Sequence, residues 1–183
     1  GDLTLTGITP SATNTLTLRC ATGQSHKDHV DKLTNARRCD QSYGVMFQFS
    51  AGFAFGLDLG YAPYVIVDGL QVQGSAGFCG AITGVHYTNI VQDCIFENQR
   101  GIYALNRGKF RNCLFIQLDT YAQPFSFENI GGQPELHGCT FVLPSDIDGT
   151  GVQLVRSAYG TLPMVNCAVF GTNITPTTGT ISA

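Results

Sequence analysis

The sequence predicts an all-β solenoid, a fold in which short strands repeat and stack along one axis. Three observations predict it: a six-residue pattern that recurs five times, turns rich in glycine between the copies, and the absence of helical periodicity over the same region. The 183-residue chain has 22 glycines, no tryptophan and only 13% charged residues. Because a typical soluble domain has about 25% charged residues, most outward positions must be neutral.

The repeated pattern begins at Val67, Val91, Phe110, Leu136 and Met164. Its first, fourth and sixth residues are apolar or cysteine and are predicted to face one core. Its third residue is always Gly, Asp or Asn, which tolerate a left-handed backbone, so each copy is predicted to bend there. Such a bend keeps side chains inward on both sides of the corner. The ladder residues expected from this register are Cys94, Cys113, Cys139, Cys167, Phe96, Phe115, Phe141, Asp93, Asn112 and Asn166.

A second set of apolar strands is expected between the copies, at 81–85, 101–105, 125–127 and 151–155. The copies lie about 19 to 28 residues apart, which predicts a right-handed parallel β-helix of about six to seven rungs. We expect an N-terminal strand and cap segment (1–44), the rungs (45–172) and a C-terminal extension (173–183). We also expect the chain to be a piece of a longer protein.

The most polar stretch, residues 21–43, is expected to cap the first rung or to form a long surface loop. Cys20, His26, His29 and Cys39 lie in or beside it and are the residue types that bind zinc. Their spacing includes neither a Cys-x-x-Cys nor a His-x3-His pair, which favours a solvated loop over a zinc site. No cofactor is predicted.

A second metal candidate is the Asp-Ile-Asp-Gly run at 146–149, which is similar to the start of a calcium-binding loop. No acidic residue stands at the twelfth position, where an EF-hand has its glutamate. Because Asp and Gly also favour turns, we interpret this run as a turn.

The chain has seven cysteines, and four of them share one inward column of the repeat. Neighbouring strands lie about 4.8 Å apart, further than the Cβ separation of about 3.8 Å that a disulfide prefers. Buried free thiols are therefore expected, and they suit assembly in a reducing cytoplasm. The sequence leaves open whether Cys20 and Cys39 pair or bind metal.

Charge and hydropathy exclude two kinds of partner. The formal net charge is −3 and no basic stripe is present, so nucleic-acid binding is not expected. No apolar run approaches the roughly 18 residues that a membrane span needs.

The recurring run typified by Phe110-Arg111-Asn112-Cys113-Leu114-Phe115 resembles the pectate-lyase-like right-handed β-helix superfamily. The resemblance covers about residues 45–170 and implies the fold. It implies no single activity, because lyases, hydrolases, adhesins and viral spikes share this solenoid. The opening run 1–7, with Ser-Ala-Thr-Asn at 11–14 and Gly-Gln-Ser-His at 23–26, resembles the start of β-helix domains in structural proteins of environmental phages.

The sequence lacks the Asn-Thr-Asp, Gly-His-Gly and Arg-Ile-Lys runs of polygalacturonase-type enzymes. A general acid and base must converge on one bond, yet the outward columns of the repeat carry a single carboxylate, Asp68. Arg111 and His137, on adjacent rungs, are interpreted as a solvated polar pair. No catalytic residue is predicted. The remaining acids are expected in loops on different rungs: Glu97, Asp119, Glu128 and Glu135.

These features favour a structural role. We expect a virion-type β-helix module, such as a phage decoration, fibre or tail-spike segment, on a virion or another extracellular surface. Two alternatives stay open: a glycan-binding or glycan-cleaving module, and a bacterial adhesin or surface-filament subunit. The expected partners are further copies of the chain, with a trimer as one option, other virion proteins, or a surface glycan.

Overall fold

All four sheets formed by the described residues are parallel, as a computed structural model shows. The described residues contain two 3₁₀ helices, η1 (His26–Asp28) and η2 (Gln41–Tyr43), and none of their helices is long and apolar enough to cross a membrane. The structure describes residues 3–5, 7–28, 39–49, 57–74, 82–98, 102–106, 108–117, 125–127, 135–142, 152–157, 161–170, 174–177 and 180–182.

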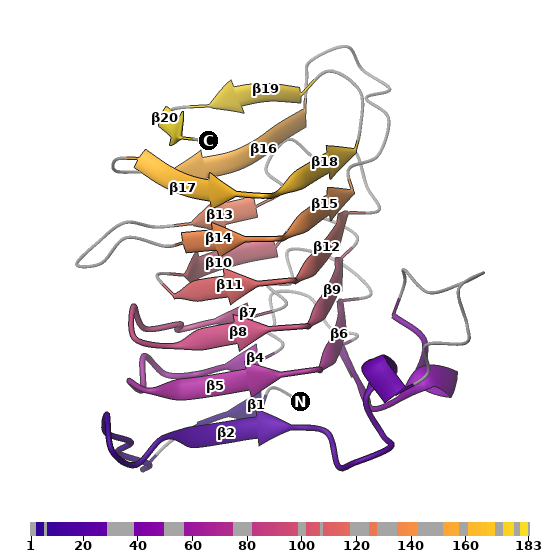
Figure 1. Ribbon diagram of the computed structural model, residues 1–183, viewed down its shortest axis with the longest axis vertical. Helices are drawn as coiled ribbons and strands as arrows, with labels where there is room; N and C mark the ends of the chain where they lie inside the picture. Colours follow the sequence, from indigo (N-terminus) through magenta and orange to yellow (C-terminus); the bar gives the residue numbers. More distant parts are fainter. Residues whose placement is uncertain are drawn as a thin grey trace.

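Two long sheets form adjoining walls of the molecule (Figure 1). In spatial order, the first sheet contains β2 (Leu16–Arg19), β5 (Val65–Asp68), β8 (Ile90–Gln92), β11 (Lys109–Arg111), β14 (Glu135–His137), β17 (Thr161–Val165) and β20 (Thr180–Ser182). The second sheet contains β3 (Met46–Phe49), β6 (Gln71–Gly74), β9 (Ile95–Asn98), β12 (Leu114–Gln117), β15 (Thr140–Val142) and β18 (Ala168–Phe170).

Two shorter sheets lie behind the first sheet in the view of Figure 1. One contains β1 (Leu3–Thr4), β4 (Leu57–Asp58) and β7 (Ile82–Thr83). The other contains β10 (Ile102–Asn106), β13 (Phe125–Phe127), β16 (Val152–Ser157) and β19 (Ile174–Thr177). Strands β7, β10, β13 and β16 overlap the four segments that were predicted between the copies of the repeat.

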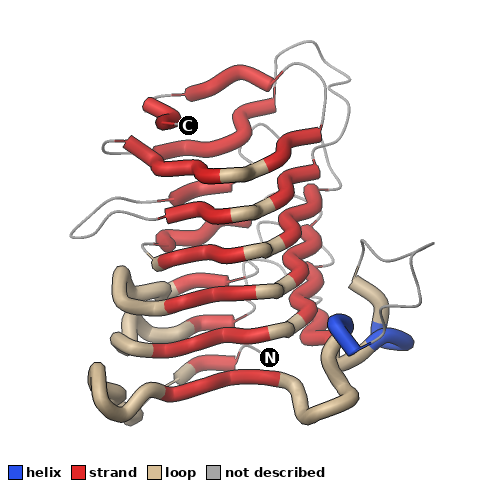
Figure 2. Tube along the Cα trace, viewed as in Figure 1, coloured by secondary structure: helices blue, strands red, loops and turns tan. Residues whose placement is uncertain are grey.

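Strands that pair are three apart in the chain, as in the order β5, β8, β11, β14 and β17. The chain therefore returns to the same sheet once per repeat and lays each new strand parallel to the last (Figure 2). The all-β prediction is confirmed, and this topology is compatible with the expected β-helix.

The inward columns of the repeat form the core. In the first sheet the register aligns Val67, Val91, Phe110, Leu136 and Met164, all at most 8% exposed. In the second sheet it aligns Val72, Phe96, Phe115, Phe141 and Val169, of which the first four are at most 1% exposed. The predicted inward positions are confirmed.

The second column carries a stack of phenylalanine rings. Phe115 lies between Phe96 and Phe141, with ring centroids 5.3 Å and 4.9 Å away and interplanar angles of 18° and 7°. These separations follow from the strand spacing, since one ring enters the core per repeat.

A left-handed bend joins the two long sheets in every copy. The φ angles are +70° at Gly69, +52° at Asp93, +51° at Asn112, +63° at Gly138 and +52° at Asn166. The amides of Gly69, Asp93, Asn112 and Gly138 each donate to a carbonyl of the next repeat, over 2.8–3.1 Å. The predicted bend residue is therefore confirmed in all five copies, and the bends lie one above another.

Two acids lie elsewhere than predicted. Glu97 and Glu135 were expected in loops, but they lie on β9 and β14 at outward positions. The prediction was wrong because both strands extend the repeat by a residue that the six-residue pattern did not include.

Substituting the central ring of the stack should test the packing. We expect Phe115→Ala to lower the free energy of unfolding by about 3–5 kcal/mol, because it leaves a cavity between two rings. Phe170→Ala is the matched control, since Phe170 is 54% exposed and its loss should cost about 0.5 kcal/mol. Urea denaturation measures both, and a loss below about 1 kcal/mol for Phe115→Ala would contradict this packing.

Candidate functional site

The N-terminal strap, defined as residues 20–28 and 39–45, packs on the outside of the second sheet and on the bends (Figure 2). Its two parts are joined where the amide of Val45 donates to the carbonyl of Gln24 over 2.9 Å. The described part of this segment contacts two successive repeats through Gly69, Gln71 and Glu97, where the sequence predicted a cap over the first rung or a long surface loop.

Buried polar contacts fix the second part of the strap. The Asp40 amide donates to Gln71 Oε1 over 2.9 Å, and Gln71 Nε2 donates to the Asp40 carbonyl over 3.1 Å. The Cys39 amide donates to Glu97 Oε2 over 3.1 Å, while Gln73 Nε2 donates to Glu97 Oε1 over 2.9 Å. Glu97 is completely buried, so its carboxylate serves as an anchor for the strap and is not a free acid.

The first part of the strap meets the lowest bend at the Gly69 carbonyl. That oxygen accepts hydrogen bonds from Ser25 Oγ over 3.1 Å, from Cys20 Sγ over 3.4 Å and from the His26 ring. A Cβ on Gly69 would lie 2.6 Å from Ser25 Oγ. Glycine is therefore required here by the close approach of the strap as well as by the positive φ.

A ladder of polar side chains follows the bends upward from the strap. Lys27 Nζ donates to Asp68 Oδ1 over 2.7 Å and to Asp93 Oδ2 over 3.2 Å, and Asn112 Nδ2 donates to Asp93 Oδ1 over 3.3 Å. The hydrogen bond to Asp68 is the largest cause of the raised pKa of Lys27. Because the Lys27 side chain is 40% exposed, solvent screens these pairs, and we expect each to stabilise the fold by less than about 1 kcal/mol.

His26 lies at the upper edge of the strap. Burial lowers the pKa of His26, and the hydrogen bond to the Gly69 carbonyl opposes this effect in part. Its Nδ1 atom is enclosed and has no hydrogen-bond partner. Burial therefore favours the neutral form of the ring.

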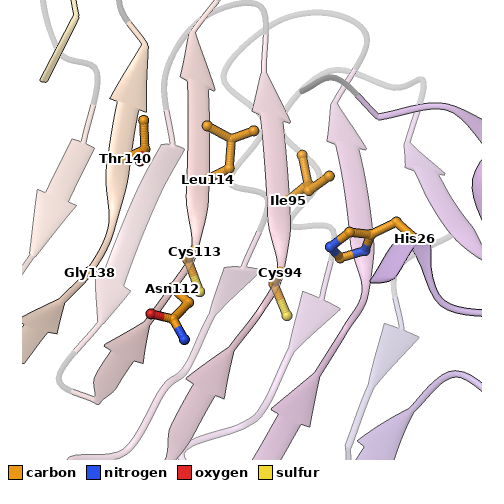
Figure 3. A pocket seen from close by; sticks show the side chains of 8 residues that line it. All are labelled: His26, Cys94, Ile95, Asn112, Cys113, Leu114, Gly138 and Thr140. Carbon is orange, nitrogen blue, oxygen red and sulfur yellow. The ribbon is translucent and has the colours of Figure 1, made fainter. Parts of the chain in front are cut away.

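Next to His26 a groove of about 290 Å³ crosses successive repeats (Figure 3). We call it the bend groove. Outward side chains of the second sheet form one wall, bend residues form the floor, and His26 closes one end. The residues used below are His26, Ile95, Asn112, Leu114, Gly138 and Thr140.

Behind the groove the predicted cysteine column lies in the core. Cys94, Cys113 and Cys139 are at most 1% exposed, Cys167 is half-buried, and none of the six described cysteines is in a disulfide. Each thiol is close to a carbonyl of the preceding repeat; Cys113 Sγ, for example, lies 3.4 Å from the Val91 oxygen. Burial is the main cause of the strongly raised pKa of Cys113, which keeps that thiol protonated.

The residues proposed as zinc ligands contact different parts of the fold. Cys20 contacts the Gly69 carbonyl, whereas Cys39 Sγ lies 3.5 Å from the Val72 oxygen and 3.7 Å from the Ile95 oxygen. In the described part of the chain, no group of three or more His, Cys, Asp or Glu residues could hold a metal ion. His29 and the 146–149 turn lie outside the described residues.

Arg111 on β11 and His137 on β14 are register partners on the outer face of the first sheet. Glu135 Oε1 lies 3.2 Å from Lys109 Nζ, and Glu135 Oε2 lies 3.5 Å from His137 Nε2, so the Glu135 carboxylate has polar partners on this face. Strands β8 and β11 separate Glu135 from Asp68, the other acid on this face. The two carboxyl groups therefore do not converge on one bond as a glycosidase requires.

No family model, curated protein or solved structure matches this chain. The features that bear on function are therefore the strap, the polar ladder and the bend groove. The sequence singled out His26 as a zinc candidate and within the run at 23–26, and it predicted no strap contact for Ser25, Gln71 or Glu97. Their roles depend on where the strap docks, and no local pattern indicates that docking.

Acid should destabilise the protein partly through His26. Because the folded-state pKa of His26 lies below its ordinary value of 6.5, the unfolded chain binds more protons below about pH 6.5. Stability therefore falls as the pH drops below that value, and His26→Gln should lose less stability between about pH 7.5 and about pH 5. Urea titrations at several pH values measure this; parallel curves for the two proteins over this range would refute the prediction.

Proposed function

We propose that this chain is a right-handed parallel β-helix of about six to seven rungs, similar to the pectate-lyase-like superfamily, and that its function is to be a rigid surface scaffold. We further propose a virion setting, as a phage decoration, fibre or tail-spike module assembled in a reducing cytoplasm. On a virion or another extracellular surface, its partners would be further copies of the chain or neighbouring virion proteins.

The observation that carries the scaffold proposal is the continuous bonding between repeats at the bends. Residues 69, 93, 112 and 138 donate their amides to the next repeat, and residues 95, 114, 140 and 168 donate to the preceding one. Opening one repeat would break bonds on both sides and expose inward residues that are almost completely buried. Such a structure resists local opening and holds its outer faces in fixed positions.

The outer faces also carry exposed apolar side chains. Val165 on β17 is 40% exposed and Phe170 on β18 is 54% exposed. Exposed apolar groups mark places where subunits meet when they join into a larger patch. The buried free thiols suit a protein that folds before it leaves a reducing compartment.

Native-state hydrogen exchange tests the rigidity. The amides of Asp93, Asn112 and Gly138 should exchange only through global unfolding, with the free energy obtained from urea denaturation. The Asn14 amide, bonded to Ser11 in an exposed turn, should exchange far faster. If the bend amides exchange through openings whose free energy is several kcal/mol lower than that of global unfolding, the scaffold proposal is wrong.

Exposed aromatic rings favour a second candidate, glycan binding or cleavage. Tyr61 and Tyr87 are 42% and 46% exposed, and the Tyr87 ring lies 4.0 Å from that of His86. Aromatic faces of this kind stack on sugars.

A glycan array combined with product analysis separates the candidates. The scaffold proposal expects neither retention of glycans nor cleavage products. Retention that is lost in Tyr87→Ala would favour the glycan-binding function, and new reducing or unsaturated ends would establish an enzyme. Tyr43→Ala, which replaces a tyrosine of the strap, is the control for Tyr87→Ala.

A further inference from the structure

We propose that the bend groove binds an extended peptide segment of a partner protein, and that hydroxyl and ammonium groups of this segment donate to a row of peptide carbonyls. The inference goes beyond the scaffold role and does not depend on it. It rests on three features: the unused carbonyls at the bends, the way the strap occupies the same row lower down, and the excess of acceptors around the groove.

The carbonyl row follows from the repeated bend. Gly69, Asp93, Asn112 and Gly138 share one left-handed conformation and lie one above another, so their carbonyls project in the same direction, about 4.8 Å apart. The Gly69 oxygen accepts bonds from the strap. Within the described part of the chain, the oxygens of Asp93, Asn112 and Gly138 accept none. Peptide carbonyls left without a partner favour a ligand that brings donors.

The strap shows what kind of segment fits the row. Ser25 Oγ donates to the Gly69 carbonyl, and the Lys27 amide donates back to Ser25 Oγ over 3.3 Å. The Lys27 ammonium then reaches up to Asp93 in the next repeat. The groove is the continuation of this row beyond His26, so its surroundings repeat those that already hold a Ser-His-Lys peptide.

The remaining groups around the groove have the same preference for donors. One hydrogen of Asn112 Nδ2 is donated to Asp93, and Asn112 Oδ1 is an acceptor. Ile95 and Leu114 supply an apolar wall. A short peptide with Ser, Thr or Lys donors and an apolar edge complements this surface.

At Gly138 the bend has no side chain of its own, and the Asn112 side chain fills the space beside it. A Cβ there would lie 2.6 Å from Asn112 Oδ1, and the φ of +63° favours glycine independently. Asn112 Oδ1 therefore lies against the backbone of this bend, as Ser25 Oγ lies against Gly69.

Amide chemical shifts of the isotopically labelled protein test the proposal. The probe is the blocked peptide Ala-Thr-Gly-Gln-Ser-His-Lys-Asp, which copies residues 21–28. We expect saturable shifts at the amides of Cys113, Gly138 and Thr140, with a Kd of about 1 mM or lower. The same peptide with its serine replaced by alanine should bind at least about fivefold more weakly, because it lacks the hydroxyl donor.

Thr140→Arg in the protein is the blocking variant, since Thr140 lines the groove from an outward position on β15. Thr17→Arg is its control, because Thr17 is exposed on β2 of the other long sheet. Shifts should vanish in the first variant and persist in the second. If Thr140→Arg does not fold, a spin-labelled peptide on the unchanged protein should broaden the amides of Gly138 and Thr140 but not that of Thr17.

Several results would overturn the proposal. These are shifts that do not saturate, equal binding by the serine and alanine peptides, equal binding by the two arginine variants, or broadening away from the groove. Saturable binding of maltotriose at these amides without peptide binding would also overturn it, since the donors would then be sugar hydroxyls. None of these results would alter the exchange behaviour on which the scaffold proposal depends.

Discussion

A left-handed backbone at one residue per repeat is the constraint on which this structure depends. Most side chains are destabilised in that conformation, and the five bends are occupied by Gly69, Asp93, Asn112, Gly138 and Asn166, the types that tolerate it best. Because every bend occurs at the same point of the repeat, the strands on either side align, the inward columns stack and the bend amides reach the next repeat. A bend displaced by one residue would turn a whole column outward.

The same constraint explains where polar chemistry gathers. Each bend turns a carbonyl outward, and the bends at Asp93, Asn112 and Asn166 add a short polar side chain, so the stacked bends form a line of hydrogen-bonding groups. The strap uses the lower end of this line through Ser25 and Lys27. Gln71 and Glu97 hold its other part against the second sheet. The bend groove begins where the strap ends, because the bends continue upward beyond His26.

The scaffold and peptide-binding proposals depend on different atoms. Rigidity depends on the bend amides, which bond along the stack, and on the buried columns, which face the core. Peptide binding depends on bend carbonyls and on outward residues such as Leu114 and Thr140. A rigid row of acceptors is also well suited to recognition, because a peptide that binds it need not order the protein.

The sequence by itself determined the repeat register, the bend residues and the core columns, since all three are periodic features of a local pattern. Only the tertiary structure decided that Glu97 is buried on a strand, that Cys20 and Cys39 contact separate carbonyls, and that His26 closes a groove. The physical reason is that these features arise where the strap, residues 20–28 and 39–45, docks against the bends and the second sheet. Contacts between a non-repeating segment and an outward face leave no periodic signal in the sequence.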